Sequence, residues 1–228
     1  MTDGGIFPDG RGGKQPGGAP GTGAAALMRR RLWLAAPLLA LAPVPLAPRA
    51  ARAMPAGGYR FRVVREGREI GTHTVRQEPG GVTRTVVALE VKLLSFTVFR
   101  MTHDYAERWQ GDRLVGFAAR TLKDGAETRL ELVASGEGLQ GRGPAGPLRL
   151  PANSAPLSWW APERLERPLF DTATGEAIAP PPRRGREGPL TRWQWPERGM
   201  VALYDNAGTW VGFTMRGDDG TPVRYEAT

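Results

Sequence analysis

Apolar and polar residues alternate along most of the chain after residue 58. Tyr59, Phe61 and Val63 alternate with Arg60 and Arg62, which predicts a strand with one buried and one exposed face. Turn signals that contain glycine interrupt the pattern about every 8–12 residues, a spacing that is typical of all-β sandwiches and barrels. We therefore expect an all-β protein.

The same pattern predicts two sets of strands. The N-terminal set is expected at 59–63, 68–77, 83–94, 97–110, 113–123 and 126–134, with shorter pieces up to Leu150, and the C-terminal set at 191–195, 200–204, 209–215 and 222–225. Short loops join neighbours within each set, so we expect antiparallel pairing, because parallel neighbours need long crossovers. These observations predict an antiparallel meander that forms a strongly curved sheet or a partly open barrel.

The two strand sets are separated by residues 151–187, which are rich in proline and lack clear periodicity. We expect this Pro- and Trp-rich segment to leave the sheet as an excursion. A short helix is expected over Pro162–Arg167, because proline suits the first helical turn. The stretch Pro180–Glu187 departs from a strand-like pattern and does not predict a continuation of the sheet.

Residues 28–53 have the pattern of a signal peptide. Arg29–Arg31 precede an apolar run that ends in the small-x-small sequence Ala51–Ala53, which predicts cleavage near Ala53. We expect a single β domain at 54–228 that is periplasmic or secreted. The twin-arginine and the general secretory routes both remain open.

Two alternatives concern the region before residue 54. Pro37, Pro43 and Pro45 interrupt the apolar run, and interior prolines disfavour a spanning helix, so we expect no retained transmembrane helix; a retained anchor is the alternative. Residues 1–27 are rich in Gly and Pro, so we expect Met28 rather than Met1 to be the initiator; the alternative is that 1–27 is a disordered extension.

Composition removes several classes of function. The chain has no cysteine, which excludes disulfides and thiolate metal sites. Residues 1–53 hold seven of the 31 basic residues and two of the 23 acidic ones, which leaves 24 basic and 21 acidic residues, a net charge of +3, in the rest of the chain. A weak excess mixed with acidic residues is not the basic surface of a nucleic-acid-binding protein, so we expect no nucleic-acid partner.

The strand expected at 97–110 carries the densest candidate chemistry. Alternation places six side chains on one of its faces, and these are Phe99, Met101, His103, Tyr105, Glu107 and Trp109. Together with Trp159 and Trp160 of the excursion they are the candidate ligand-binding residues, expected to face an apolar cavity if this face is concave. The alternative is that the aromatic residues close an open end of the sheet.

His103 and Glu107 lie about 13 Å apart along such a strand, too far for a direct bond. Each needs a partner on a neighbouring element, and the alternative to a ligand is a hydrogen bond across the sheet. No catalytic signature surrounds Ser158, and no motif such as HExxH connects His73 with His103. We expect neither a cofactor nor a metal site.

Several phrases occur together in an order that resembles one bacterial family. They are Tyr59-Arg60-Phe61, Gly67-x-x-Ile70-Gly71-x-His73, Phe99-Arg100, His103, Glu107-x-Trp109, Gly111-x-Arg113-Leu114, Trp160 before Pro162, and Asp171-x-x-Thr174-Gly175-Glu176. Over nearly all of 58–228 the chain resembles the domain-of-unknown-function family 6134. The resemblance implies an antiparallel β domain exported from a Gram-negative cell, and it implies no catalytic residue.

Three functional hypotheses follow for such an exported domain. The first is a non-enzymatic protein whose curved sheet encloses an apolar small molecule or a lipid, or that has a role in envelope maintenance. The second is a structural protein whose sheet edge recruits a partner strand. The third is a hydrolase that uses His103 and Glu107.

Overall fold

The computed structural model describes residues 54–94, 96–136, 138–217 and 219–228. The predicted extension at 1–27 and the predicted signal peptide at 28–53 lie outside the described residues and stay predictions. Within the described ranges, no helix is both long and apolar enough to span a bilayer.

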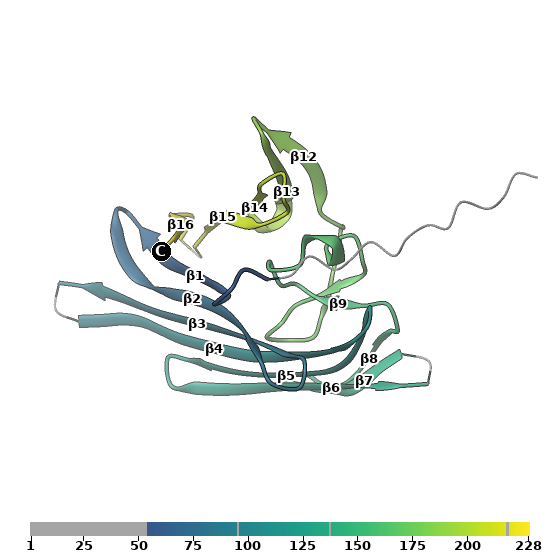
Figure 1. The fold of residues 1–228 in the computed structure, drawn as a ribbon. Helices are drawn as coiled ribbons and strands as arrows, with labels where there is room; N and C mark the ends of the chain where they lie inside the picture. Colours follow the sequence, from purple (N-terminus) through teal and green to yellow (C-terminus); the bar gives the residue numbers. More distant parts are fainter. Residues whose placement is uncertain (1–53, 95, 137, 218) are drawn as a thin grey trace, which may run out of the picture. The chain divides into compact units, whose positions relative to one another are not determined.

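In the described part of the chain, thirteen strands form one antiparallel sheet that does not close (Figure 1). The N-terminal strands are β1 (Tyr59–Arg65), β2 (Arg68–Glu78), β3 (Val82–Leu93), β4 (Phe96–Gln110), β5 (Arg113–Lys123), β6 (Ala126–Ser135), β7 (Gly138–Gly143) and β8 (Gly146–Pro151). The C-terminal strands are β12 (Arg183–Glu187), β13 (Leu190–Trp195), β14 (Met200–Tyr204), β15 (Trp210–Arg216) and β16 (Pro222–Ala227). The all-β, antiparallel and curved prediction is therefore confirmed.

The two strand sets join through the first and last strands of the domain. β16 pairs with β1, with Val63 opposite Tyr225, so the order runs from β12 through β16 to β1 and on to β8. Every other neighbouring pair in this sheet is consecutive in sequence. One long-range pairing therefore turns two meanders into one curved sheet.

Local turn chemistry explains why the meander forms where the sequence indicates it. At the β5–β6 turn, Asp124 and Gly125 have φ values of 51° and 89°. Positive φ at both central residues matches the type I′ turn, whose twist suits a two-residue hairpin. The Asp-Gly signal therefore sets both the turn and the pairing of the strands beside it.

Residues 152–182, which we call the inner segment, leave the main sheet as expected. They contain a small sheet of β9 (Ala155–Pro156), β10 (Leu169–Phe170) and β11 (Ala177–Ile178), and the 3₁₀ helix η1 (Pro162–Arg164). β9 and β10 are parallel, because the twelve residues between them are enough for a crossover. In Figure 1 the inner segment lies on the concave side of the sheet.

Two predictions for the excursion need correction. Pro180–Glu187 was not expected to continue the sheet, yet Arg183–Glu187 pairs with β13 as an edge strand. All five of its side chains are exposed, so this strand forms by backbone pairing and leaves no hydrophobic periodicity. The helix expected over Pro162–Arg167 is shorter, because it ends after one 3₁₀ turn at Arg164.

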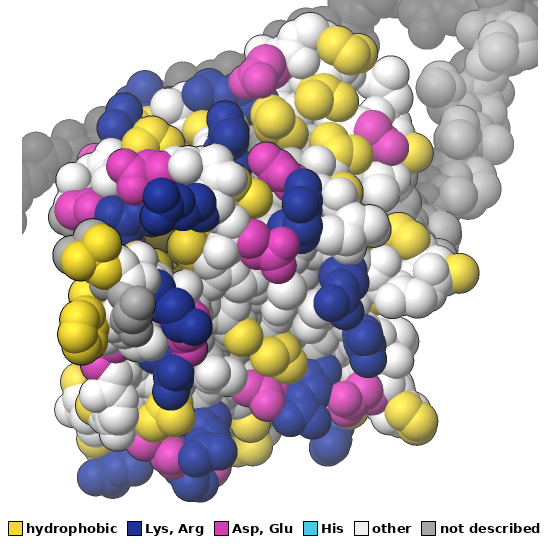
Figure 2. Space-filling model, turned by 90° about the vertical axis from the view of Figure 1, so that its left-hand side faces the viewer, with side chains coloured by type: hydrophobic (Ala, Val, Ile, Leu, Met, Phe, Trp, Pro, Cys, Tyr) yellow, Lys and Arg dark blue, Asp and Glu magenta, His cyan; other side chains and the backbone are white. Residues whose placement is uncertain are grey.

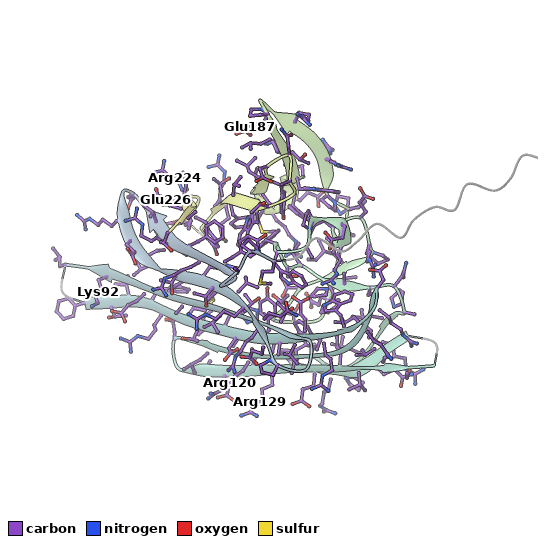
Figure 3. All side chains as sticks on the ribbon, viewed as in Figure 1. Lys92, Arg120, Arg129, Glu187, Arg224 and Glu226 are labelled. Atoms are coloured by element: carbon purple, nitrogen blue, oxygen red, sulfur yellow. The ribbon has the colours of Figure 1, made fainter. Side chains whose placement is uncertain are left out.

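The inner segment connects two hydrophobic clusters. Leu157, Trp159 and Leu169 pack with side chains of β1, β2 and β13–β15. Phe170, the next residue, packs with side chains of β4–β7. The convex face of the sheet is polar there, where Arg120 and Arg129 point away from the core (Figure 3). The inner segment thus fills one part of the concave face.

Candidate functional site

Burial changes steadily along the inward face of β4. Glu107 is fully buried, Tyr105 and His103 are 3% and 8% exposed, and Met101 and Phe99 are half-buried. The outward residues of this stretch are more exposed, so the predicted alternation on β4 is confirmed. The inner segment covers the Glu107 end of this face and leaves the Phe99 end open.

At the covered end, two tryptophans hold the carboxylate of Glu107. Trp109 Nε1 donates to Glu107 Oε2 at 2.8 Å, and Trp160 Nε1 donates to Oε1 at 3.0 Å. Trp109 follows Glu107 by two residues and so lies on the same face of β4, and Trp160 belongs to the inner segment. This network fastens the inner segment to β4.

Arg164 completes this network. Its guanidinium carbon lies 3.6 Å from the ring centre of Trp109 and 4.5 Å from that of Trp160, a cation–π sandwich, and its Nη1 lies 3.9 Å from Glu107 Oε2. Burial raises the pKa of Glu107 and lowers that of Arg164, because each charge is removed from water. The indole donors and Arg164 oppose the shift of Glu107, and Glu107 opposes that of Arg164.

His103 belongs to a separate network. Its Nδ1 lies 2.8 Å from Thr121 Oγ1 on β5, and its Nε2 lies 2.9 Å from Thr172 Oγ1 in the inner segment. Burial lowers the pKa of His103, although Asp171 opposes this shift. His103 therefore matches the expected alternative of a core histidine bonded across the sheet, and no hydrogen bond connects it with Glu107.

His73 on β2 is the most unusual polar side chain of the concave face. It is 2% exposed, and neither ring nitrogen has a hydrogen-bond partner among the residues that the structure describes. Its ring packs edge-on against Trp210 and Tyr225, with centroids 5.1 and 5.3 Å away. Burial, with a smaller contribution from His103, lowers the pKa of His73 to about 3, so the ring is neutral at physiological pH.

The remaining predicted site residues lie in two different surroundings. Trp159 packs against Trp195 and Phe213, and its carbonyl oxygen accepts a hydrogen bond from Tyr204. Tyr105 lies between Glu107 and His103 on β4 and packs in the cluster that contains Phe117. The predicted residues thus share one face but divide into a packed group and an open group.

The open group forms what we call the apolar strip. It consists of Leu89, Val91, Phe99 and Met101, which are half-buried. Met101 lies directly opposite Leu89, and Phe99 lies opposite Val91. The strip begins two residue pairs beyond His103, at the next inward-facing position, and extends away from the inner segment.

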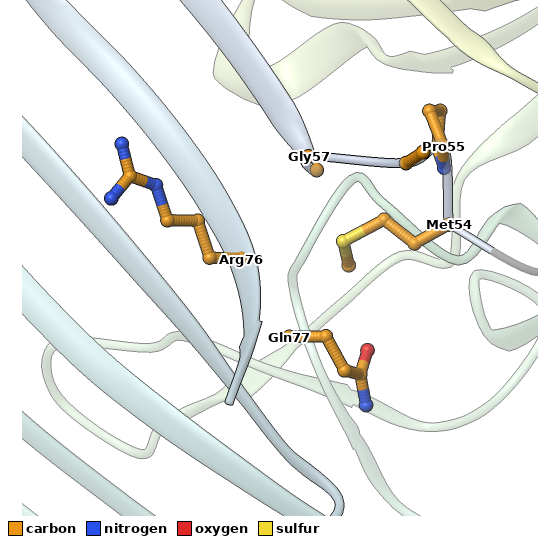
Figure 4. A pocket seen from close by; sticks show the side chains of 7 residues that line it. Met54, Pro55, Gly57, Arg76 and Gln77 are labelled. Carbon is orange, nitrogen blue, oxygen red and sulfur yellow. The ribbon is translucent and has the colours of Figure 1, made fainter. Parts of the chain in front are cut away.

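A hollow of about 800 Å³ lies elsewhere, at the start of β1 (Figure 4). It is lined by Met54–Gly58 and by Arg76 and Gln77 of β2. The side chain of Arg76 points away from Met54 and Pro55. This hollow shares no lining residue with the apolar strip.

Sequence reasoning missed Arg164 and the unpartnered state of His73. The tripeptide Pro-Glu-Arg occurs twice, at 162–164 and 196–198, and nothing in it marks Arg164 as the buried copy. Among the described residues, no group of three His, Asp or Glu side chains is placed to hold a metal ion.

The family model described as "Domain of unknown function (DUF6134)" matches residues 61–228. The chain therefore belongs to this family, which confirms the resemblance that the motifs indicated. No curated protein is significantly similar to the chain. A crystal structure of a DUF1089-family protein from Pseudomonas aeruginosa matches with a TM-score of 0.42 and 15% identity, over 63% of this chain and 89% of that one.

Proposed function

We propose that this member of the DUF6134 family is an exported protein that binds the apolar part of a lipid-like molecule on its apolar strip. The observation that carries the proposal is the loss of cover along β4, from Glu107 at 0% exposure to the half-buried Met101 and Phe99. Apolar side chains on a concave surface are the usual lining of small-molecule sites.

The inner end of the strip favours a ligand with a hydrogen-bonding group. His73 and His103 lie in one row across the sheet, with Val87 between them, and Leu89 and Met101 lie in the next row. A buried polar group without a partner costs about 1–3 kcal/mol. A hydroxyl or carboxyl group of a ligand that reached His73 would remove this cost, so the proposed ligand is an amphiphile.

A hydrolase that uses His103 and Glu107 has less support. Each residue is held in its own hydrogen-bond network, and the Glu107 oxygens both accept from indole N–H groups. A general base must lie within hydrogen-bond reach of the proton that it removes. The two residues are therefore better explained as parts of the packed core.

Recruitment of a partner strand also has less support. The sheet ends at β12 and β8, and β12 carries three exposed arginines, while β8 contains Pro147 and Pro151. Charged side chains and prolines are the devices by which proteins block edge pairing. Both edges are thus protected.

Native mass spectrometry of the exported protein, with displacement of a bound fatty-acid fluorophore, tests the proposal. We expect a co-purifying lipid and at least about tenfold weaker probe binding by Met101→Glu, because the charge would lie in the ligand's apolar path. The matched control is Val133→Glu, which places the same charge at a position 61% exposed on β6 and should bind like the wild type. Absence of both lipid and probe binding, or equal affinities of the two variants, would overturn the proposal.

A further inference from the structure

The hairpin of β3 and β4 extends beyond the rest of the sheet. The last pair between β2 and β3 is Gly71 with Leu89, and the last pair between β4 and β5 is Met101 with Lys123. Asp124 of the β5–β6 turn still bonds the backbone of Arg100, and beyond Arg100 the described residues of the two strands form ladder pairs only with each other, as far as Leu93 and Phe96. The three pairs beyond Arg100 make a projection of about 10 Å.

The end of this projection is apolar and exposed. Among the described residues six large hydrophobic side chains are exposed, and three of them are here: Leu94 at 90%, Phe96 at 75% and Val98 at 55%. We call these three residues the hairpin tip. Lone two-stranded hairpins are marginally stable. Contacts within the sheet therefore do not account for apolar side chains at this end, which indicates a contact outside the protein.

Basic side chains lie directly behind the hairpin tip. Lys92 and Arg100 both bind Glu90, at 2.8 and 2.7 Å, yet their side chains remain 60% and 65% exposed. Lys123 lies over the ring of Phe99 at 5.6 Å. Figure 3 places Lys92 at the free end of the hairpin, and Figure 2 shows basic and hydrophobic side chains next to one another on the face at this end.

We propose that the hairpin tip docks the protein onto an anionic lipid bilayer. Apolar side chains of interfacial elements enter about 5–10 Å into the boundary between headgroups and acyl chains, a depth that the projection reaches. Lys92 and Arg100 are placed to meet lipid phosphates, with their stems along apolar surface. The paired hairpin backbone keeps its hydrogen bonds at this depth.

The exposed area favours a bilayer over a second copy of the chain. Three side chains at these exposures present roughly 400 Å², whereas a stable protein interface buries about 800 Å² on each partner. The net charge of Glu90, Lys92 and Arg100 also makes two such hairpins repel one another. The inference does not depend on ligand binding, because the hairpin tip and the apolar strip share no residue.

Vesicle flotation of the exported protein tests the inference. We expect the wild type to float with vesicles of phosphatidylethanolamine and phosphatidylglycerol, and Leu94→Asp/Phe96→Asp to bind about tenfold or more weakly. The control Val133→Asp places an aspartate at an exposed apolar position of another strand and should float like the wild type. All variants are isolated in the same exported form, so any part of residues 1–53 that they retain is the same in each.

A site-specific label keeps the inference testable if the double variant does not fold. The chain has no native cysteine, so Val98→Cys and Val133→Cys can each carry one environment-sensitive fluorophore. We expect a blue shift and quenching by spin-labelled lipid at position 98 only. Equal flotation of all variants, no shift at position 98, or a wild-type dimer that Phe96→Asp dissociates would overturn the inference.

Discussion

The two ends of the concave face of β4 differ in burial and in hydrogen bonding. At one end Glu107 is fully buried, yet both of its oxygens accept hydrogen bonds from tryptophans. At the other end Phe99 and Met101 are half-buried, and the nearby His73 has no partner for either nitrogen. The difference separates a part that holds the fold together from the part that we propose receives a ligand.

The largest expected effect lies at the covered end. Glu107→Ala leaves Arg164 buried without its carboxylate and two indole N–H groups without an acceptor, so we expect a loss of about 3–5 kcal/mol in the free energy of unfolding. Urea denaturation measures it. The control is Asp104→Ala on the outward face of β4, where the exposed pair with Arg84 contributes less than about 1 kcal/mol. Equal losses in the two variants would contradict the role of Glu107 as an anchor.

An intermediate effect is expected from His73 as the pH changes. Its folded-state pKa of about 3 lies below the unfolded value of 6.5, so below pH 6.5 the unfolded state takes up a proton that the folded state does not. Stability is therefore lost as the pH falls from 6.5 toward 3, by about 2 kcal/mol between pH 7 and pH 5.

The variant His73→Phe isolates this effect, because it keeps an aromatic ring against Trp210 and Tyr225 but cannot be protonated. Urea titrations at both pH values should show that the variant lacks about 2 kcal/mol of the wild type's pH-dependent loss. Subtraction of the two curves removes the contributions of all other groups. Parallel curves would show that His73 has a partner in solution.

The smallest effect on stability is expected at the hairpin tip. Phe96→Asp should change the free energy of unfolding by less than about 0.5 kcal/mol, because the side chain is exposed. Phe170→Ala is the contrasting variant, since Phe170 is fully buried between the sheet and the inner segment and its truncation should cost about 3–5 kcal/mol. Thermal unfolding followed by circular dichroism measures both. A large loss from Phe96→Asp would mean that the tip packs against the domain.

Most of the fold was predictable because strand signals are local. The alternation in β1 and β4 and the Asp124-Gly125 turn each set one strand or hairpin without reference to distant residues. The edge strand β12 was missed because all of its side chains are exposed, so its sequence carries no periodicity. The parallel pair of β9 and β10 was equally invisible, since two-residue strands have no pattern.

For the candidate site, the sequence predicted which residues share one face of a strand but not the surroundings of each residue. Sequence spacing placed Phe99, His103 and Glu107 on one side of a strand, and the structure confirms that they share it. Sequence spacing did not separate the covered residues from the open ones, because that separation depends on where the inner segment ends. Arg164 was missed for the same reason: only its position between Trp109 and Trp160 distinguishes it from other arginines.

The sequence by itself determined the class of fold, the antiparallel pairing and the inward face of β4, because periodicity and turn chemistry act between neighbouring residues. Only the tertiary structure decided that β16 pairs with β1, that the inner segment covers Glu107 and not Met101, and that His73 has no hydrogen-bond partner among the described residues. These outcomes depend on contacts between residues far apart in the chain. Such contacts are set by the packing of the whole domain and leave no local pattern in the sequence.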